Sequence, residues 1–256
     1  MPNIQYLGGD STPAFNNLYQ DDTNSRDGNR FTTTTFGKLV FTADFLMIAK
    51  SYYDQKLLRH EMYQIFGDRD LVRFRTDIDF QKVMYGRPAS FDIKHISDGN
   101  SDSVFSIQFE IPSGYKYSLT RSDQISSDDI SFGMNFKLPE RPTYTHSENK
   151  FRIYNPSDIA IDPYYQRHDL LLRINFEGDF YRIENKTNAT AYQFNRALTM
   201  NENVMLNGLK TSLNGLPDSK DSDFGYLKLE KGWNDIVVTG ATSHRTIFSF
   251  PFVYID

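Results

Sequence analysis

The side chains that most often carry out chemistry in proteins are few and scattered in this sequence. The five histidines show no His-x-x-x-His spacing, and none of them forms a His-x-Glu motif on a predicted helix, where metal ligands could be brought together. The sequence contains no cysteine, which excludes disulfide scaffolds and thiolate metal sites. It also lacks a nucleophile elbow, a phosphate-binding loop and a dinucleotide-binding fingerprint. We therefore predict no catalytic residue, no metal site and no cofactor.

One acidic segment resembles the first half of a calcium-binding loop. Asp98-Gly-Asn-Ser-Asp102 has the alternating oxygen ligands of such a loop. The sixth position is Ser103, where the loop requires glycine, and the twelfth is Phe109, where it requires a bidentate glutamate. Clusters of Asp, Gly, Asn and Ser are also typical of tight turns. The segment therefore predicts a hairpin turn.

Aromatic side chains are unusually frequent, at 15% of the residues. Exposed rings could form a carbohydrate-binding face, and the candidates for such a glycan site are Tyr164, Tyr165, Tyr192 and Trp233, the single tryptophan. In a β-sandwich, however, most aromatic rings fill the core between the sheets. The sequence favours the core interpretation and leaves the glycan site as an alternative.

Charge and hydropathy exclude other classes of protein. The net charge is −5 with acidic and basic residues well mixed, which argues against sequence-specific binding of nucleic acid. No apolar run approaches the roughly 20 residues of a membrane-spanning helix. The first ten residues lack the basic and apolar regions of a signal peptide. These features predict a soluble protein that is made in the cytoplasm and has no membrane span.

The first half of the chain predicts an arm followed by a β domain with one helix. Residues 1–30 are polar and are expected to form an arm or loop. Residues 31–112 contain short alternating segments, typical of antiparallel strands, and one helix over residues 52–66. Ser51 is expected to cap that helix and Gly67 to end it. The side chains expected on its buried face are Leu57, Leu58, Met62, Ile65 and Phe66.

The second half predicts a linker and a β-sandwich. Residues 113–145 have isolated aromatics and the two prolines Pro139 and Pro142, and we expect a linker there with a domain boundary near Pro142. Residues 146–256 contain regularly spaced short strands. In the closing stretch we expect turns at Lys231-Gly232 and Thr239-Gly240, followed by an aromatic terminal strand.

Several of these segments, in this order, resemble the distal tail proteins of siphophages. In the second half they are Phe151–Pro163, Ile183–Thr187, Leu227–Asn234 and the terminal strand Phe248–Tyr254. In the first half they are Arg26-Asp-Gly28 and the helical segment Tyr53–Phe66. The long polar stretch before Arg26 departs from the family, whose members begin directly with a strand.

The resemblance implies a mainly β fold with two domains. Residues 31–112 would be a β-sandwich-like domain that forms a ring, and residues 146–256 a galectin-like β-sandwich. The ring, a hexamer, would sit at the distal end of the tail tube in the virion, after synthesis in the host cytoplasm. Its partners would be other copies of the chain, the major tail protein, the tail-tip protein, and receptor-binding or other baseplate proteins. The protein would not be an enzyme.

Two alternatives from other functional classes stay open. One is a carbohydrate-binding module that recognises cell-wall glycans through the sandwich. The other is a hydrolase of the bacterial envelope, since a pair of carboxylates can meet in space without any sequence signature.

Overall fold

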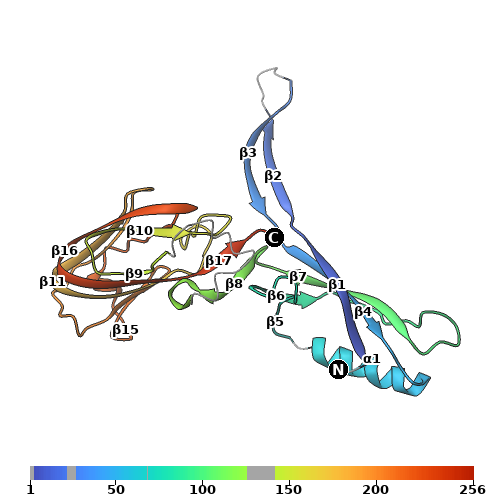
Figure 1. Ribbon diagram of the computed structural model, residues 1–256. Helices are drawn as coiled ribbons and strands as arrows, with labels where there is room; N and C mark the ends of the chain where they lie inside the picture. The colour runs from blue at the N-terminus through green and yellow to red at the C-terminus, as the bar shows by residue number, and fades with distance from the viewer. Residues whose placement is uncertain (1–2, 22–26, 68, 126–141) are drawn as a thin grey trace. The chain divides into compact units, whose positions relative to one another are not determined.

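The computed structural model describes residues 3–21, 27–67, 69–125 and 142–256 (Figure 1). The chain divides into two compact units. The N-terminal unit comprises Met1–Thr76, Val83–Lys116 and Ile255–Asp256, and the C-terminal unit comprises Asp77–Lys82 and Tyr117–Tyr254. The predicted fold class is confirmed as mainly β, with one α-helix among the described residues. Within these residues, no helix is long and apolar enough to cross a membrane.

The N-terminal unit is built on an antiparallel sheet in which β1, β4, β7 and β6 are neighbours in that order, and β5 pairs with β6. Alternate residues of β7 are buried, from Ser103 to Ile111, because successive side chains of a strand point to opposite faces. The apolar face of β4 and β7 forms the core of the unit. The strands are β1 (Ile4–Thr12), β4 (Leu39–Met47), β5 (Val72–Phe74), β6 (Lys82–Pro88) and β7 (Ser103–Ile111).

The expected helix is α1 (Tyr52–Phe66), and it packs on this core through Leu58 and Met62. The Ser51 side chain accepts a hydrogen bond from the backbone N–H of Asp54 and caps the first turn. The prediction that Leu57 and Ile65 share the buried face is wrong, since they are 64% and 50% exposed. Residues three, four and seven apart share a helix face, so the buried row is that of Gln55, Leu58 and Met62.

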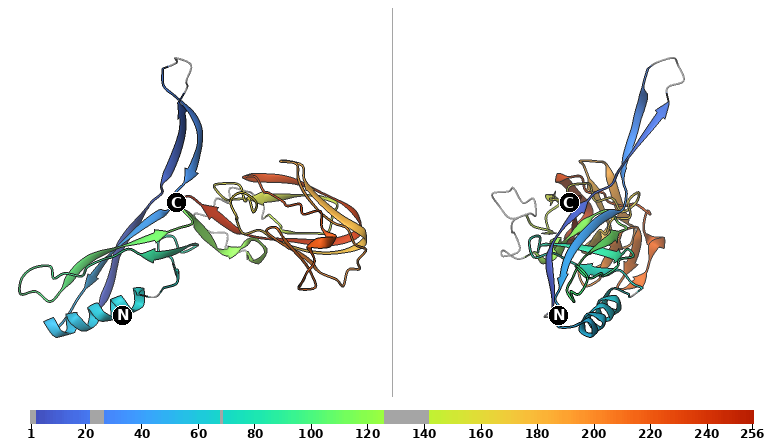
Figure 2. Two further views of the ribbon diagram at one scale, coloured as in Figure 1. Left: turned by 180° about the vertical axis from the view of Figure 1, so that it is seen from behind. Right: turned by 90° about the vertical axis from the view of Figure 1, so that its right-hand side faces the viewer.

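Two strands that follow β1 leave the sheet as a separate antiparallel hairpin. They are β2 (Phe15–Asp21) and β3 (Asn29–Phe36), which pair only with each other among the described strands. Both views of Figure 2 show this hairpin standing clear of the sheet of its unit, while α1 lies beside that sheet. Residues 1–30, which were expected to form an arm or loop, thus include strand β1, because Ile4–Thr12 is paired along its length with β4.

The C-terminal unit contains an antiparallel sheet in the order β10-β16-β11-β13-β14-β15, with β12 on β11 and β9 on β16. Strands β8 and β17 also pair with each other. Its large aromatic side chains, such as Phe176, Tyr181 and Phe194, are fully buried. The strands are β8 (Lys116–Arg121), β9 (Thr145–His146), β10 (Lys150–Asn155), β11 (Leu171–Asn185), β12 (Thr190–Phe194), β13 (Val204–Asn207), β14 (Lys210–Leu213), β15 (Leu216–Pro217), β16 (Gly232–Ser249) and β17 (Pro251–Tyr254).

The two long strands, β11 and β16, are bent at glycines. The first half of β11 pairs with the second half of β16, and the register between them shifts around Gly178. A Cβ atom on Gly178 would lie 2.7 Å from the carbonyl oxygen of Gly240, and both glycines have positive φ angles. The expected turn at Thr239-Gly240 is therefore a bend inside a continuous strand.

The described part of the expected linker is mostly structured. Lys116–Arg121 is strand β8, and Ser122–Gln124 is a short 3-10 helix. The division between the units falls after Lys116, earlier than the predicted boundary near Pro142. The reason is that the polar side chains of Ser118 and Ser122 bond to the backbone of Phe252 and Phe250 inside the C-terminal unit. Residues 126–141 of that segment lie outside the described residues.

Candidate assembly interface

The β2–β3 hairpin begins and ends at a fixed base. The backbone N–H of Gly37 donates a 2.8 Å hydrogen bond to the carbonyl of Ala14, directly below the first strand pair. The ring of Phe36 packs edge-on against the ring of Tyr115, with centroids 5.5 Å apart, and Tyr115 is buried. The base is therefore held by the N-terminal unit, while the strands beyond it depend on each other.

A bulge collects aromatic rings on one face of the hairpin. Phe15 lies opposite Phe36, and Asn17 lies opposite Thr34. The register then shifts between Leu18 and Tyr19, so that Tyr19 lies opposite Phe31 and Thr32 is left as the extra residue of β3.

Directly opposed residues of a β pair point to the same face. The shift therefore places Phe31, rather than Thr32, on the face that carries Phe15, Tyr19 and Phe36. The ring centroids are 5.6 Å apart for Phe15 and Phe36, and 6.0 Å apart for Tyr19 and Phe31. We call Phe15, Tyr19, Phe31 and Phe36 the aromatic face.

Most of the aromatic face is open to solvent. Phe15, Tyr19 and Phe31 are 53%, 58% and 55% exposed, and every residue of β2 is exposed. An isolated two-stranded hairpin is marginally stable in water, and exposed apolar rings mark interaction surfaces. The face is uncharged and aromatic, which is the composition of the buried centre of a protein interface. The hairpin is therefore suited to bind another protein surface.

The N-terminal unit exposes a second apolar row on α1. Tyr53 and Leu57 are one turn apart, Ile65 lies two further turns along the same face, and they are 81%, 64% and 50% exposed. This row lies away from the buried row of Gln55, Leu58 and Met62. The unit thus presents two apolar surfaces besides its core.

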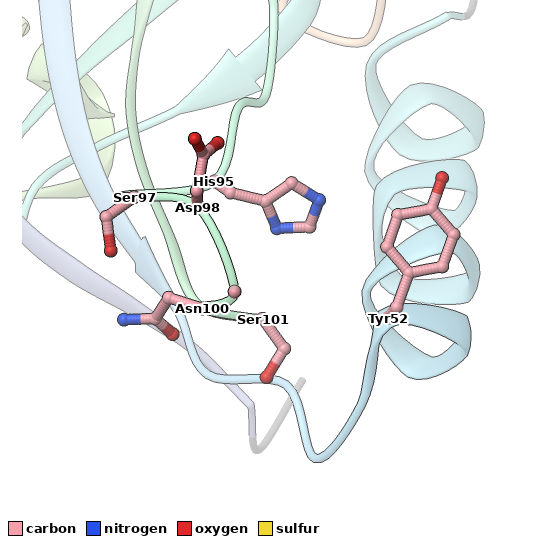
Figure 3. A pocket seen from close by; sticks show the side chains of 7 residues that line it. Tyr52, His95, Ser97, Asp98, Asn100 and Ser101 are labelled. Carbon is pink, nitrogen blue, oxygen red and sulfur yellow. The ribbon is translucent and has the colours of Figure 1, made fainter.

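A pocket of about 290 Å³ lies between the start of α1 and the segment 97–101 (Figure 3). The ring of Tyr52 is stacked on His95, and the Lys56 ammonium lies 5.3 Å from the Tyr52 centroid. Among the polar groups, Ser101 donates to the carbonyl of Ala49, and the carboxylate of Asp102 accepts from the Ala49 N–H. Segment 97–101 thus fastens the chain just before α1, and it is the turn that the sequence predicts before β7. Among the described residues, no group of three or more His, Asp or Glu is placed to bind a metal ion.

The structure separates the predicted glycan-site residues. Tyr192 is fully buried in β12, where its hydroxyl meets that of Thr211, so it has no surface for a sugar. Trp233, in β16, is 39% exposed, and it contacts the Arg152 guanidinium at 4.6 Å and the Tyr154 ring at 5.1 Å. Tyr164 and Tyr165 are the candidates that lie together, with ring centroids 4.8 Å apart.

Sequence reasoning did not find the aromatic face. The missed residues are Phe15, Tyr19 and Phe31, which fall in or beside a stretch interpreted as a polar arm. The signal present was the aromatic residue at each end of the tract Phe31-Thr-Thr-Thr-Thr-Phe36, with Gly28 before it as a turn residue.

Most of the N-terminal unit resembles a known family of domains. Residues 4–111 match the model of the phage tail protein RIFT-related domain. This part of the chain is similar to that family of phage tail domains. The match spans β1 to β7 and includes the hairpin and α1, so both apolar surfaces described above lie within the matched residues.

The fold also matches that of a known phage protein over nearly all of the chain. The crystal structure of the Dit protein of phage SPP1, described as a paradigm of the hub adsorption apparatus in phages that infect Gram-positive bacteria, superposes with a TM-score of 0.71. The identity is 9%, and the alignment covers 98% of this chain and 94% of that chain. The resemblance to siphophage distal tail proteins, predicted from the sequence, is confirmed.

Two further structures show weaker similarity. They are the activated baseplates of phage P2 with calcium and with strontium, with TM-scores of 0.43 and 0.42 and identities of 12% and 13%. These alignments cover 97% and 96% of this chain and 90% of the other chain in each case. No curated protein sequence matches the chain.

Proposed function

We propose that this protein is a structural hub of a phage tail, located in the virion at the distal end of the tail tube. In this role six copies form a ring that joins the tube, made of the major tail protein, to the tail-tip protein and to receptor-binding or other baseplate proteins. The protein acts by binding other proteins and is not an enzyme. The match to the phage tail domain family and the Dit-like fold support this assignment.

The observation that carries the proposal is the aromatic face on the N-terminal unit. A hairpin with three rings more than half exposed gains stability by packing on a partner, and a second copy of the chain is the partner that a ring of subunits supplies. Because ring contacts are heterologous, the hairpin of one copy binds a different surface on the next copy. The exposed row of α1, Tyr53, Leu57 and Ile65, is a surface of suitable composition on the same domain.

The test is a hairpin-free protein in which Ala14 is joined to Gly37 by a short glycine-serine turn. These two residues already share a 2.8 Å backbone hydrogen bond, so the rest of the unit keeps its geometry. Light scattering and negative-stain microscopy measure the assembly. We expect the intact protein to form a ring with a central hole and the shortened protein to be monomeric. The circular dichroism spectrum of the shortened protein should change only by the loss of the two hairpin strands.

A matched pair of point variants distinguishes the effect of losing a ring from the aromatic face from the effect of losing apolar surface in general. Phe31→Thr removes a ring from the aromatic face, whereas Leu18→Thr removes a side chain of similar exposure, 51%, from the opposite face. We expect the first variant to weaken the ring and the second to leave it intact. A shortened protein that forms the same ring would show that the hairpin is not the contact between copies. An intact protein that stays monomeric at high concentration and in the presence of its tail partners would contradict the hub itself.

A further inference from the structure

Three tyrosines form an exposed cluster in loops of the C-terminal unit. The rings of Tyr164 and Tyr226 are stacked, with centroids 5.0 Å apart and planes 15° apart. Tyr165 meets Tyr164 edge-on, and Tyr164 and Tyr165 are 52% and 74% exposed. We call these three rings the tyrosine cluster. It joins two segments far apart in the sequence and leaves the ring of Tyr165 largely open to solvent.

The backbone beneath the cluster is fixed on both segments. Ile161 and Leu229 form an isolated β-bridge in which each backbone N–H donates to the other carbonyl, at 2.8 and 3.0 Å. Beyond this isolated bridge the chain turns at residues 163–165, where the stacked rings of Tyr164 and Tyr226 again connect the two segments. A buried carboxylate, that of Asp162, accepts the backbone N–H groups of Tyr164 and Tyr165, each at 2.9 Å. The rings are therefore presented by a rigid support.

Lys228 lies close enough to Tyr226 for its charge to offset part of the rise that burial causes in the pKa of that tyrosine, and Lys228 belongs to a small polar network. The Lys228 ammonium lies 2.8 Å from the Glu230 carboxylate, which also accepts a 3.2 Å hydrogen bond from the Asn188 amide. The hydrogen bond with Glu230 and the charges of Glu230 and Asp162 raise the pKa of Lys228. In the sequence, Tyr226, Lys228 and Glu230 alternate with the buried residues Leu227 and Leu229. Their three side chains therefore lie on one side of the segment. Aromatic and polar groups thus meet on one small surface, held in place by mutual contacts.

The size and chemistry of this surface fit a sugar better than a protein. A stable protein interface takes about 800 Å² and roughly 20 to 30 residues from each partner, far more than three rings and three polar side chains. A pyranose has an apolar C–H face that stacks on an aromatic ring and a rim of hydroxyls that bond to carboxylates, ammonium groups and amides. Asp162, Glu230 and Lys228 together carry one negative charge, which disfavours anionic ligands.

We propose that the tyrosine cluster with Lys228 and Glu230 is a binding site for a neutral saccharide. The exposed ring of Tyr165 stacks on the sugar, and Lys228 and Glu230 bond to its hydroxyls. Asn188, whose amide donates to the Lys228 carbonyl and to Glu230, holds Glu230 in place. Trp233 and Tyr192 take no part. This site is independent of the hub role, because it lies in the C-terminal unit and needs no contact between copies.

The test is isothermal titration calorimetry of the full chain with neutral oligosaccharides of glucose, galactose or N-acetylglucosamine, and with oligogalacturonate as the anionic probe. We expect at least one neutral series to bind and the anionic probe not to bind at concentrations up to about 10 mM. Tyr165→Ala and Glu230→Gln should each weaken binding by roughly tenfold or more. Tyr53→Ala, an exposed tyrosine of α1, and Trp233→Ala are the matched controls and should bind as the intact protein does. Thermal denaturation checks that every variant is folded.

Three results would overturn the site. One is the failure of all neutral oligosaccharides to bind. Another is binding that Tyr165→Ala and Glu230→Gln leave unchanged, or that Trp233→Ala abolishes. The third is that Tyr165→Ala leaves sugar binding untouched and instead releases a tail protein from the assembly, which would assign the cluster to a protein interface.

Discussion

The side-chain amide of Asn185 donates a 2.8 Å hydrogen bond to the side-chain oxygen of Asn234, and both residues are fully buried. Asn185 ends β11, and Asn234 lies near the start of β16. Asn185 also donates to the carbonyl of Lys228, while Asn234 accepts the N–H of Glu230 and donates to its carbonyl. The pair therefore ties two strands to the segment that carries part of the tyrosine cluster.

Replacing Asn234 by alanine should destabilise the C-terminal unit strongly. The change leaves the N–H of Glu230 and one amide hydrogen of Asn185 without an acceptor in a buried site, at a cost of about 3 kcal/mol. Urea denaturation followed by the fluorescence of Trp233 measures the loss. Asn188→Ala is the control, because Asn188 is only half-buried, and it should cost about 1 kcal/mol. Equal losses for the two variants would show that the buried amide pair has no special role.

Gly178→Ala should straighten or break the bend that β11 shares with β16. The added methyl group would lie 2.7 Å from the carbonyl oxygen of Gly240, at a φ of +148° that side chains rarely adopt. We expect a loss of about 2 kcal/mol or more in the free energy of unfolding. Gly215→Ala is the control: its φ is +83°, but nothing lies within 4 Å of the added atom, so the loss should be about 1 kcal/mol. If both variants lose the same amount of unfolding free energy, the close approach of the two strands does not require glycine at position 178.

The bend at Gly178 and Gly240 also shows which features the sequence could predict and which it could not. The helix and the short C-terminal strands follow from local spacing, and they were predicted. The glycine at position 240 was interpreted as a turn, because a glycine gives the same local signal whether the chain reverses or two paired strands bend together. Only the partner strand decides between them, and it lies more than sixty residues away.

The β2–β3 hairpin and the surroundings of the glycan candidates were harder to predict from the sequence, for a related reason. Every residue of β2 is exposed, so the strand has none of the alternation that reveals a half-buried strand. Tyr192 and Tyr165 are the same residue type, and a glutamine follows each of them in the sequence. One lies in β12 and points to the core, the other follows the Asp162 turn and points to solvent. Residue type alone does not distinguish these environments.

Acid should destabilise the C-terminal unit through His244. Its Nε2 lies 3.1 Å from the carbonyl of Glu148 and so carries the proton, which leaves Nδ1 to accept from the Thr246 hydroxyl at 3.1 Å. Thr246 in turn accepts from the Tyr181 hydroxyl at 2.7 Å. Burial, with a smaller effect of the neighbouring His146, lowers the pKa of His244. The folded state therefore keeps this side chain neutral.

The sign of the pH effect follows from this lowered pKa. The unfolded chain binds a proton at His244 near pH 6.5, while the folded chain resists it. Stability is therefore complete above about pH 6.5 and falls as the pH decreases through the folded pKa. Denaturation midpoints between pH 8 and 5 should fall less steeply for His244→Gln than for the intact protein. The remaining slope includes His168, whose pKa burial also lowers. An unchanged slope in the variant would contradict this assignment.

Deleting single residues from β3 tests whether the bulge exists to place Phe31. Removing Thr32 eliminates the extra residue, so Leu18 still opposes Thr33 and Tyr19 still opposes Phe31, and the aromatic face is complete. Removing Phe31 instead brings Thr32 opposite Tyr19 and takes a ring from the face. We expect light scattering to find the same assembly for the Thr32 deletion as for the intact protein, and a weaker assembly for the Phe31 deletion. The two variants have equal chain length, so a shorter hairpin cannot explain a difference between them. If both deletions weaken assembly equally, the partner recognises the twist that the bulge gives the strands rather than the rings themselves.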